Sequence, residues 1–171
     1  AQGSDPFDVI FFDQCFQGSI DILYEVAAAA HYFVASPNYA WLVAAYDRYL
    51  VKFTPSATPE ELATSIINGY EASLDQHHPN SIFAVKASDI AGIAAAISNL
   101  GDALGRALHA GENDRIAAAV QQGQYVDTTQ CSRQNLELGP PDELIGADSF
   151  AQKLQESFGA GDSAGVYAAA D

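Results

Sequence analysis

The chain has 171 residues, of which 49% are hydrophobic, a content that suits one globular domain with a substantial core. Its net charge of −15, from 22 acidic and 7 basic side chains, argues against nucleic-acid binding, because phosphate neutralisation needs clustered Lys and Arg. No apolar run approaches the roughly 20 residues that a membrane span needs. The sequence contains no Met and opens at Ala1, almost directly before its most apolar strand, so we expect a processed or excised piece of something larger.

The most informative stretch lies near the start. Four apolar residues, Val9 to Phe12, stand between acidic residues and predict a strand that is buried on both faces. Asp13 follows directly, and Cys15 comes two residues later. Helical spacing begins after Ser19, the expected N-cap of a helix that reaches about Ala30. This order of strand, tight turn and helix puts the thiol at the carboxyl end of a strand, where open α/β sheets build their active sites.

Two interpretations of Cys15 stay open at this point. The partial positive charge of a helix N-terminus favours the thiolate, which is the nucleophilic form of cysteine, and its N–H groups can receive an oxyanion. The alternative is a buried cysteine that only fills space, since free cysteine is among the most buried residue types. A single cysteine beside a strand does not decide between them.

The remaining elements follow in an α/β order. Tyr32–Ala35 is a second apolar strand, and the helix between the two strands makes them parallel neighbours by right-handed crossover. A third strand is expected over Ser81–Ala87. Further helices are expected from apolar stripes or caps that begin near Trp41, Thr58, Ser88, Asn113 and Asp148. The last helix ends at Phe158, and residues 159–171, rich in Ala and Gly, are expected to be a flexible tail after one domain over residues 1–158.

The candidate partners of the thiol are few. The histidines are His31, His77, His78 and His109. The adjacent pair has no further ligand at metal-site spacing and is interpreted as a surface pair. A cysteine nucleophile needs a base or an imidazolium within hydrogen-bond reach, but no histidine precedes Cys15, and His31 is expected at the far end of its strand. Cys131 lies in a polar stretch and is interpreted as a bystander thiol without a disulfide.

The segment from Asp13 to Asp21, DQCFQGSID, resembles the nucleophile segment of the clostripain-like cysteine peptidases, which belong to the caspase-like clan. In that family the pattern is Asp-x-Cys-x-Met-Gly-x-x-Glu after an apolar strand. Asp13, Cys15 and Gly18 match it. Gln17 stands in place of the Met, and Asp21 replaces the Glu conservatively.

The next stretch, from Ala30 to Ser36 and on to Trp41, is similar to the family's second strand and its substrate-binding loop, with Pro37 where a Glu is usual. The resemblance implies a caspase-like, mostly parallel sheet flanked by helices, of which residues 1–158 would be the C-terminal, nucleophile-bearing part. Two or three strands leave edges unpaired, so a segment or chain not present here is expected to complete the sheet. In this clan the catalytic histidine lies upstream of the cysteine, so the resemblance places it on that segment. Autoproteolytic splitting, known in the family, would explain this, and the chain alone is expected to be inactive.

The implied function is a cysteine endopeptidase that cleaves after Arg or Lys through a thioester on Cys15. N–H groups near Cys15 and Gly18 would stabilise the oxyanion, and Asp13 would pair with the basic P1 side chain. Ser36 and Trp41 would contribute to the substrate site. Two alternatives remain: Asp13 as a structural acid at the turn, and the whole chain as an inactive caspase-like scaffold or interaction module.

The resemblance also bears on surroundings and cofactors. It makes calcium a candidate cofactor, and an acidic body would attract such a cation or a cationic substrate, although solubility is the ordinary explanation of the charge. It further implies a bacterial protein that is secreted or held in the cell envelope. The expected partners are the segment that carries the histidine and a peptide or protein substrate.

Overall fold

The computed structural model describes residues 5–38, 40, 45–74, 82–125 and 144–171. Contacts within the chain divide it into two compact units. The first unit comprises Ala1–Gly92 and Asp127–Leu136, and the second comprises Ile93–Val126 and Glu137–Asp171. The sequence predicts a single domain over residues 1–158, so this division is a feature that composition and spacing did not reveal.

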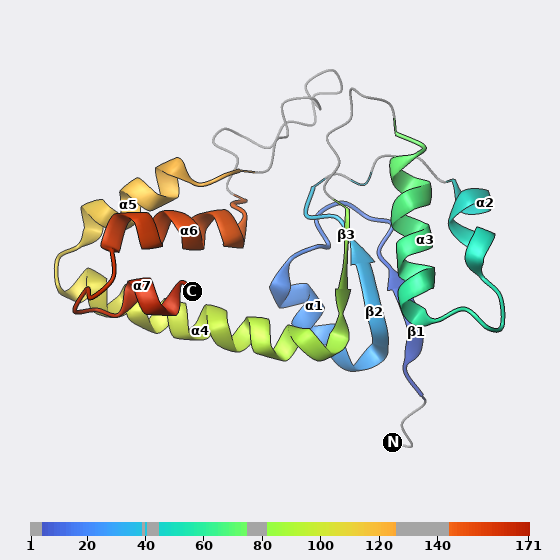
Figure 1. The fold of residues 1–171 in the computed structure, drawn as a ribbon, viewed down its shortest axis with the longest axis horizontal. Helices are drawn as coiled ribbons and strands as arrows, with labels where there is room; N and C mark the ends of the chain where they lie inside the picture. The colour runs from blue at the N-terminus through green and yellow to red at the C-terminus, as the bar shows by residue number, and fades with distance from the viewer. Residues whose placement is uncertain (1–4, 39, 41–44, 75–81, 126–143) are drawn as a thin grey trace. The chain divides into compact units, whose positions relative to one another are not determined.

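The first unit is built on a three-stranded sheet with the order β1-β2-β3 (Figure 1). β1 (Phe7–Phe11) and β2 (Ala30–Ala35) are parallel, with Val9 opposite Tyr32. β3 (Phe83–Lys86) pairs with β2 in the antiparallel direction. The parallel neighbours expected from right-handed crossover are confirmed, and so is the α/β class with a sheet flanked by helices.

One face of the sheet is covered by α1 (Ile20–Val26) and by the first turns of α4 (Ala87–His109). Leu23 from α1 and Ile90 from α4 are buried against Phe33 in β2. The apolar stripe predicted for the long helix therefore starts in this core.

The opposite face is covered by α3 (Pro59–Glu71), with α2 (Tyr46–Tyr49) beside it. Val34 of β2 is buried under Tyr70 of α3, and Tyr49 of α2 joins the same cluster. The strands carry apolar side chains on both faces, and helices cover both faces. The uninterrupted apolar run at the end of β1 predicts this arrangement.

The helix α3 starts with a capping box at the predicted N-cap, Thr58. The Thr58 hydroxyl accepts a hydrogen bond from the Glu61 N–H at 3.2 Å, and the Glu61 carboxylate accepts one from the Thr58 N–H at 2.8 Å. The Thr58 N–H, above all, lowers the pKa of Glu61. The two bonds satisfy N–H groups that a helix start otherwise leaves unpaired, so the helix boundary follows from the sequence.

Two expected helices are shorter than their apolar patterns suggested. α1 gives way to a 3-10 turn, η1 (Ala27–Ala29), and β2 already begins at Ala30 rather than at Tyr32. α2 passes into a second 3-10 turn, η2 (Leu50–Lys52). The expected start of that helix at Trp41 lies outside the described residues.

The second unit is helical. It contains the later turns of α4, together with α5 (Asn113–Gln122), α6 (Ala147–Phe158) and α7 (Val166–Ala169). Its buried core consists of Ala103, Ala107, Ala119, Leu154, Phe158, Ala164 and Val166. Although α4 is 23 residues long, neither it nor another helix in the described ranges is apolar enough to cross a membrane.

The stretch from Gly159 onward, expected as a flexible tail, packs into this helical core. Ala164 and Val166 are buried, and the Arg106 side chain donates to the Ala164 carbonyl at 3.1 Å. The Asp162 carboxylate accepts the N–H groups of Val166 and Tyr167 at 3.0 and 2.9 Å, which starts α7. The expectation of a loose tail is therefore corrected: small residues allow close packing here.

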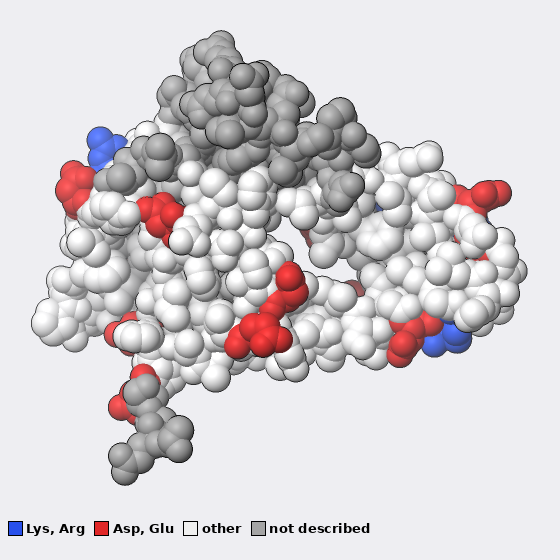
Figure 2. Space-filling model, turned by 180° about the vertical axis from the view of Figure 1, so that it is seen from behind, with Lys and Arg blue, Asp and Glu red and all other residues white. Residues whose placement is uncertain are grey.

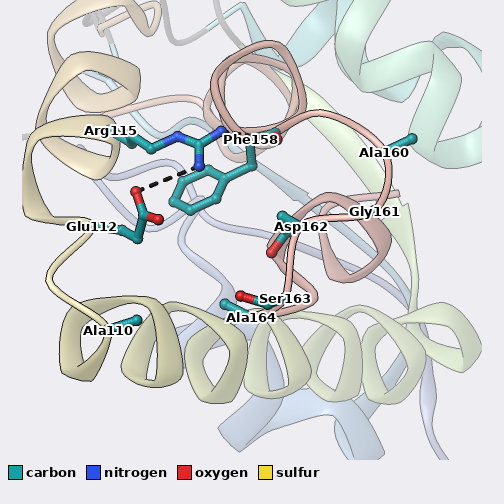
Figure 3. Close-up of a pocket in the computed structure, with 9 residues that line it drawn as sticks. All are labelled: Ala110, Glu112, Arg115, Phe158, Ala160, Gly161, Asp162, Ser163 and Ala164. Atoms are coloured by element: carbon teal, nitrogen blue, oxygen red, sulfur yellow. Dashed lines mark hydrogen bonds and ion pairs between the residues drawn. The ribbon is translucent and has the colours of Figure 1, made fainter.

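Arg115 joins α5 to the end of α6 beside a hollow of about 230 Å³ (Figure 3). Its guanidinium donates to the carbonyl oxygens of Ser157, at 2.6 and 3.1 Å, and of Phe158, at 2.9 Å. The guanidinium carbon lies 4.4 Å from the centre of the Phe158 ring, and Glu112 is at 3.4 Å. Because the chain itself uses these donors, Arg115 is a cap for the last carbonyls of α6.

We expect Arg115→Ala to lower the free energy of unfolding by about 2 kcal/mol, since it removes charge-assisted bonds to helix-end carbonyls. Urea unfolding followed by circular dichroism measures the change. The control is Lys153→Ala, which removes the surface pair with Glu156 at 2.7 Å and should cost less than about 1 kcal/mol. Equal effects of the two substitutions would contradict the capping role.

Candidate active site

The chain reverses direction just after β1. The Phe12 N–H donates to the Val34 carbonyl at 2.9 Å, so the parallel pairing continues one residue beyond β1. Two further backbone bonds, each of 2.9 Å, join Phe16 N to Asn38 O and Gly18 N to Ser36 O. Since the partner numbers now fall as the chain advances, residues 16–18 run antiparallel to residues 36–38. The β1–α1 loop, residues 12–19, is thus fastened to the loop that follows β2.

Gly18 is required by this close approach of two backbones. A Cβ atom at this position would lie 2.6 Å from the Pro37 nitrogen and 2.7 Å from the Ser36 carbonyl carbon. It would also lie 2.7 Å from a ring carbon of Phe83. Real Cβ atoms essentially never approach backbone so closely, so no other residue fits without displacing the loop.

The residues between Asp13 and Gly18 form a tight turn with an uncommon backbone conformation. Phe16 has a φ of 60°, and among the described residues it is the one residue other than glycine with a positive φ. Such conformations carry strain and cluster at functional sites. The Gln17 side chain donates to the Cys15 carbonyl at 3.3 Å, so the residue that departs from the family pattern braces the turn.

Cys15 lies in this turn and is partly buried. Its sulfur accepts a hydrogen bond from the Ala40 N–H at 3.4 Å and lies 4.0 Å from the Ala40 carbonyl oxygen. The thiol is therefore at the carboxyl end of a parallel strand, as predicted, and is held between two loops. Among the described residues it forms no disulfide.

Asp13 stands two residues before the cysteine, half-buried at the end of β1. The Tyr46 hydroxyl, from α2, donates to its Oδ2 atom. This bond, more than the charge of Asp13 alone, raises the pKa of Tyr46. The Asp13 carboxylate thus accepts a hydrogen bond from an α2 side chain, and its role, substrate-binding or structural, stays a prediction.

The other expected site residues are placed differently. Ser36 is 4% exposed, and its hydroxyl accepts the Asn38 N–H at 3.1 Å, so it contributes to the turn after β2. The N–H of Gly18 is engaged by the Ser36 carbonyl. Trp41 lies outside the described residues. The substrate roles of Ser36 and Trp41 and the oxyanion role of Gly18 stay predictions.

His31, in β2, is exposed near the amino end of that strand, the end opposite to the cysteine. Ser36, at the cysteine end of the strand, is five residues of extended chain away from His31, or about 16 Å. His31 is therefore too far from Cys15 for a hydrogen bond. His109 belongs to the second unit, and His77 and His78 lie outside the described residues. Within the first unit as described, Cys15 has no imidazole partner.

Surface charge and possible metal ligands among the described residues assign no further role at this site. On the face shown in Figure 2, acidic side chains occur in several separate places and basic ones in fewer, in keeping with the net charge of −15. In the described ranges, no group of three or more His, Cys, Asp or Glu side chains could hold a metal ion. Calcium therefore stays a prediction from the resemblance.

The family model of the clostripain family matches residues 2–165, which is nearly the whole chain. The chain belongs to the clostripain family. The match includes the strand, the turn with Asp13 and Cys15, and the close approach at Gly18. It confirms the family suggested by the resemblance of residues 13–21.

A solved structure of a cysteine protease from B. fragilis has a similar fold, with a TM-score of 0.52 and 16% sequence identity. The similarity covers 96% of this chain and 64% of that chain, so the clostripain-family chain described here spans about two thirds of the length of its structural relative. At this identity the comparison supports the fold. Curated proteins give no match to the sequence.

Sequence reasoning missed the role of α2 in the site. The apolar spacing that predicts a helix near Trp41 does not single out Tyr46, and the bond from Tyr46 to Asp13 spans 33 residues. One signal was available: the acid after β1 faces the sheet side on which α2 packs, because side chains alternate along a strand.

Proposed function

We propose that this chain is the nucleophile-bearing part of a cysteine endopeptidase that cleaves peptide bonds after Arg or Lys. The observation that carries the proposal is the β1–α1 loop, which holds a partly buried thiol and a carboxylate two residues apart at the carboxyl end of a parallel strand. A nucleophile and a site for a cationic side chain are the two elements that such a reaction needs first. Membership of the clostripain family supports both roles.

In the proposed reaction the Cys15 thiolate attacks the carbonyl carbon of the scissile bond, and the carbonyl oxygen takes up the negative charge. The tetrahedral intermediate then expels the amine, which receives a proton from a histidine imidazolium, and a thioester remains on Cys15. Water attacks the thioester, the acid product leaves, and the sulfur is again free. The imidazolium gives its proton to the leaving amine, and the resulting imidazole takes a proton from the attacking water.

The oxyanion would be received by backbone N–H groups of the turn. The N–H of Gly18 already donates to Ser36, whereas the N–H of Cys15 has no partner in the part of the chain that the structure describes. We therefore assign the main oxyanion donor to Cys15 itself and assign Gly18 the role of allowing the turn. A donor of this kind, once positioned, contributes about 3 kcal/mol to catalysis.

The histidine would come from a further segment or a second polypeptide. β1 is an edge of the described sheet, and Phe7 in β1 is 69% exposed, so an added strand could pair there. A strand that paired with β1 would bring its own end to the edge of the sheet where Cys15 lies. The 64% coverage of the related solved chain leaves room for such a segment. Without it, we expect no peptidase activity.

The proposal also covers the protein's location, its maturation and its cofactor. A secreted or cell-envelope bacterial peptidase, matured by its own cleavage, is the setting that family resemblance suggests. Calcium is retained as a candidate cofactor on the same ground. A net charge of −15 favours encounters with basic peptides, because long-range attraction raises association rates.

Asp13→Asn tests the assignment of specificity. In the complete protein, we expect kcat/KM for peptides with Arg at P1 to fall about 100-fold, the value of a charge-assisted hydrogen bond, while the amide still accepts from Tyr46. Peptides with the uncharged analogue citrulline at P1 should be affected much less. Fluorogenic substrates that differ only at P1 measure the ratio.

The matched control is Asp8→Asn, which removes an exposed carboxylate of β1 and should leave both rates within about twofold. If Asp13→Asn lowers both substrates equally, Asp13 serves the turn and does not select the basic side chain. If the complete protein cleaves neither substrate, the peptidase proposal itself is wrong.

A further inference from the structure

The short helix α2, which brings Tyr46 to Asp13, lies against α3 (Figure 1). The Tyr49 side chain of α2 is 2% exposed and shares a buried cluster with Ile66 and Tyr70 of α3. A single helical turn is not stable by itself, because nucleating a helix is costly. Contacts with the rest of the first unit, above all with α3, therefore decide where α2 lies.

Gly69, in the last turn of α3, allows the two helices to approach closely. A Cβ atom there would lie 3.0 Å from a ring carbon of Tyr49, 3.1 Å from the Arg48 carbonyl carbon and 3.2 Å from the Tyr49 nitrogen. Such distances are tighter than nine in ten real Cβ contacts, so an alanine would push α2 away by a few tenths of an ångström. Because glycine is unfavourable inside a helix relative to alanine, this close approach gives the glycine a physical reason.

Two side chains fasten α2 to α3 by hydrogen bonds. The Arg48 Nη1 atom donates to the Ala72 carbonyl oxygen and to the Ser73 hydroxyl, each at 3.0 Å. The Ser65 hydroxyl donates to the Tyr49 carbonyl oxygen at 3.0 Å. Since Arg48 and Tyr49 belong to α2, these bonds oppose a movement of α2 away from α3.

Tyr46 connects the position of α2 to the Asp13 carboxylate. Its ring meets the Tyr49 ring edge-on, with 5.4 Å between ring centres, and its hydroxyl donates to Oδ2 of Asp13. Bonds between a hydroxyl and an oxygen span only about 2.5–3.0 Å, so a shift of α2 by a few tenths of an ångström weakens this bond. An ionised carboxylate has about four acceptor positions, which leaves others for a bound cation.

We propose that the docking of α2 on α3 sets the selectivity for a basic P1 side chain: Gly69 and Arg48 position α2, and Tyr46 thereby holds Asp13. The inference rests on the proposed function, since it needs Asp13 to receive the P1 side chain. Gly69, Arg48 and Tyr46 are positioning residues, because they act through Asp13. A carboxylate that is already held in place loses less side-chain freedom when it binds a cation.

The test compares two reagents with the same reactive group on the complete protein. With tosyl-lysyl chloromethyl ketone or its phenylalanyl analogue, the Cys15 thiolate displaces chloride and an S–C bond forms. The ratio of the two second-order rate constants reports the site of the P1 side chain, because a change at the thiol alters both rates alike.

The variants are Tyr46→Phe, Gly69→Ala and Arg48→Met, and each of the last two is also combined with Tyr46→Phe. The control for the tyrosine is Tyr24→Phe, at an exposed position of α1. The control for the glycine is Gly101→Ala in α4, where a Cβ atom meets nothing within 4 Å. A circular dichroism spectrum of each variant confirms folding.

We expect Tyr46→Phe to lower the lysyl-to-phenylalanyl ratio about fivefold, the value of ordering one side chain. Gly69→Ala and Arg48→Met should each lower the ratio about threefold, because they weaken the bond from Tyr46 without removing it. In the Tyr46→Phe background they should lower the ratio no further, since residues that act through one bond are not additive. Both controls should leave the ratio unchanged.

An unchanged ratio in any of the three single variants overturns the inference. So does a Gly69→Ala effect that is equally large with and without the Tyr46 hydroxyl, because α3 would then not act through Tyr46. A ratio that rises in Tyr46→Phe also contradicts it, since the phenol would then compete with the substrate for Asp13. If Gly69→Ala does not fold, Arg48→Met decides by the same comparison.

The proposed function fails separately, in the wild-type protein. There, tosyl-lysyl chloromethyl ketone would react no faster with Cys15 than its phenylalanyl analogue.

Discussion

Cys15→Ala in the complete protein is expected to reduce kcat for a peptide with Arg at P1 by a factor of about 10⁴ or more, since the nucleophile of a covalent mechanism is removed. The rate of a fluorogenic substrate measures this loss. KM should change little, because the substitution leaves Asp13, the proposed contact of the P1 side chain, in place. Alanine also removes the hydrogen bond from Ala40 to the sulfur, but the backbone bonds that fasten the turn remain.

The control for this substitution is Cys131→Ala, which changes the chain's second thiol and should leave kcat within about twofold. A circular dichroism spectrum of each variant confirms folding. If Cys15→Ala keeps a substantial part of the activity, the nucleophile lies elsewhere. If Cys131→Ala abolishes it, the assignment of the two thiols is reversed.

Gly18→Ala is expected to lower both stability and activity strongly, although it adds a single methyl group. That carbon would lie 2.6–2.7 Å from backbone atoms of Ser36 and Pro37, and the loops would have to separate. Overpacking of this kind costs about 1–3 kcal/mol or more, and it displaces the turn that holds Cys15. We expect a lower free energy of unfolding and a fall in kcat/KM of about 100-fold, since small misplacements of catalytic groups are costly.

Gly92→Ala is the matched control, because a Cβ atom at Gly92 meets no atom within 4 Å. In the interior of α4, this change should stabilise the protein by about 0.5–1 kcal/mol. Urea unfolding and kcat/KM are measured for both variants. A Gly18→Ala protein that is as stable and as active as the wild type would show that the close approach of residues 18 and 36 is not maintained in solution.

Local signals in the sequence predicted the local structure of the site well. The apolar run before Asp13 ends at Phe12, one residue beyond the end of β1, and Ser19 stands at the N-cap position of α1. Thr58 and Glu61 form the capping box that their spacing predicts. These features depend on neighbours within a few residues, and residue type decides them.

Features that depend on distant partners were not predictable in the same way. The bond from Tyr46 to Asp13 arises from packing of α2 on the sheet, which no spacing encodes. The antiparallel direction of β3 depends on how the chain returns after α3. The close packing of residues 159–171 rests on small side chains, whose composition alone is equally typical of a loose segment.

The roles of Cys15 as nucleophile and Asp13 as the partner of the P1 side chain are tested most directly by a crystal structure of the complete protein treated with a peptide aldehyde that carries Arg at P1. Addition of the Cys15 thiol to the aldehyde carbon gives a hemithioacetal, a stable analogue of the tetrahedral intermediate. We expect a bond between Cys15 Sγ and that carbon, with a guanidinium nitrogen about 2.7–3.0 Å from an oxygen of Asp13. An unmodified Cys15 sulfur, or an Arg side chain bound away from Asp13, would contradict these roles.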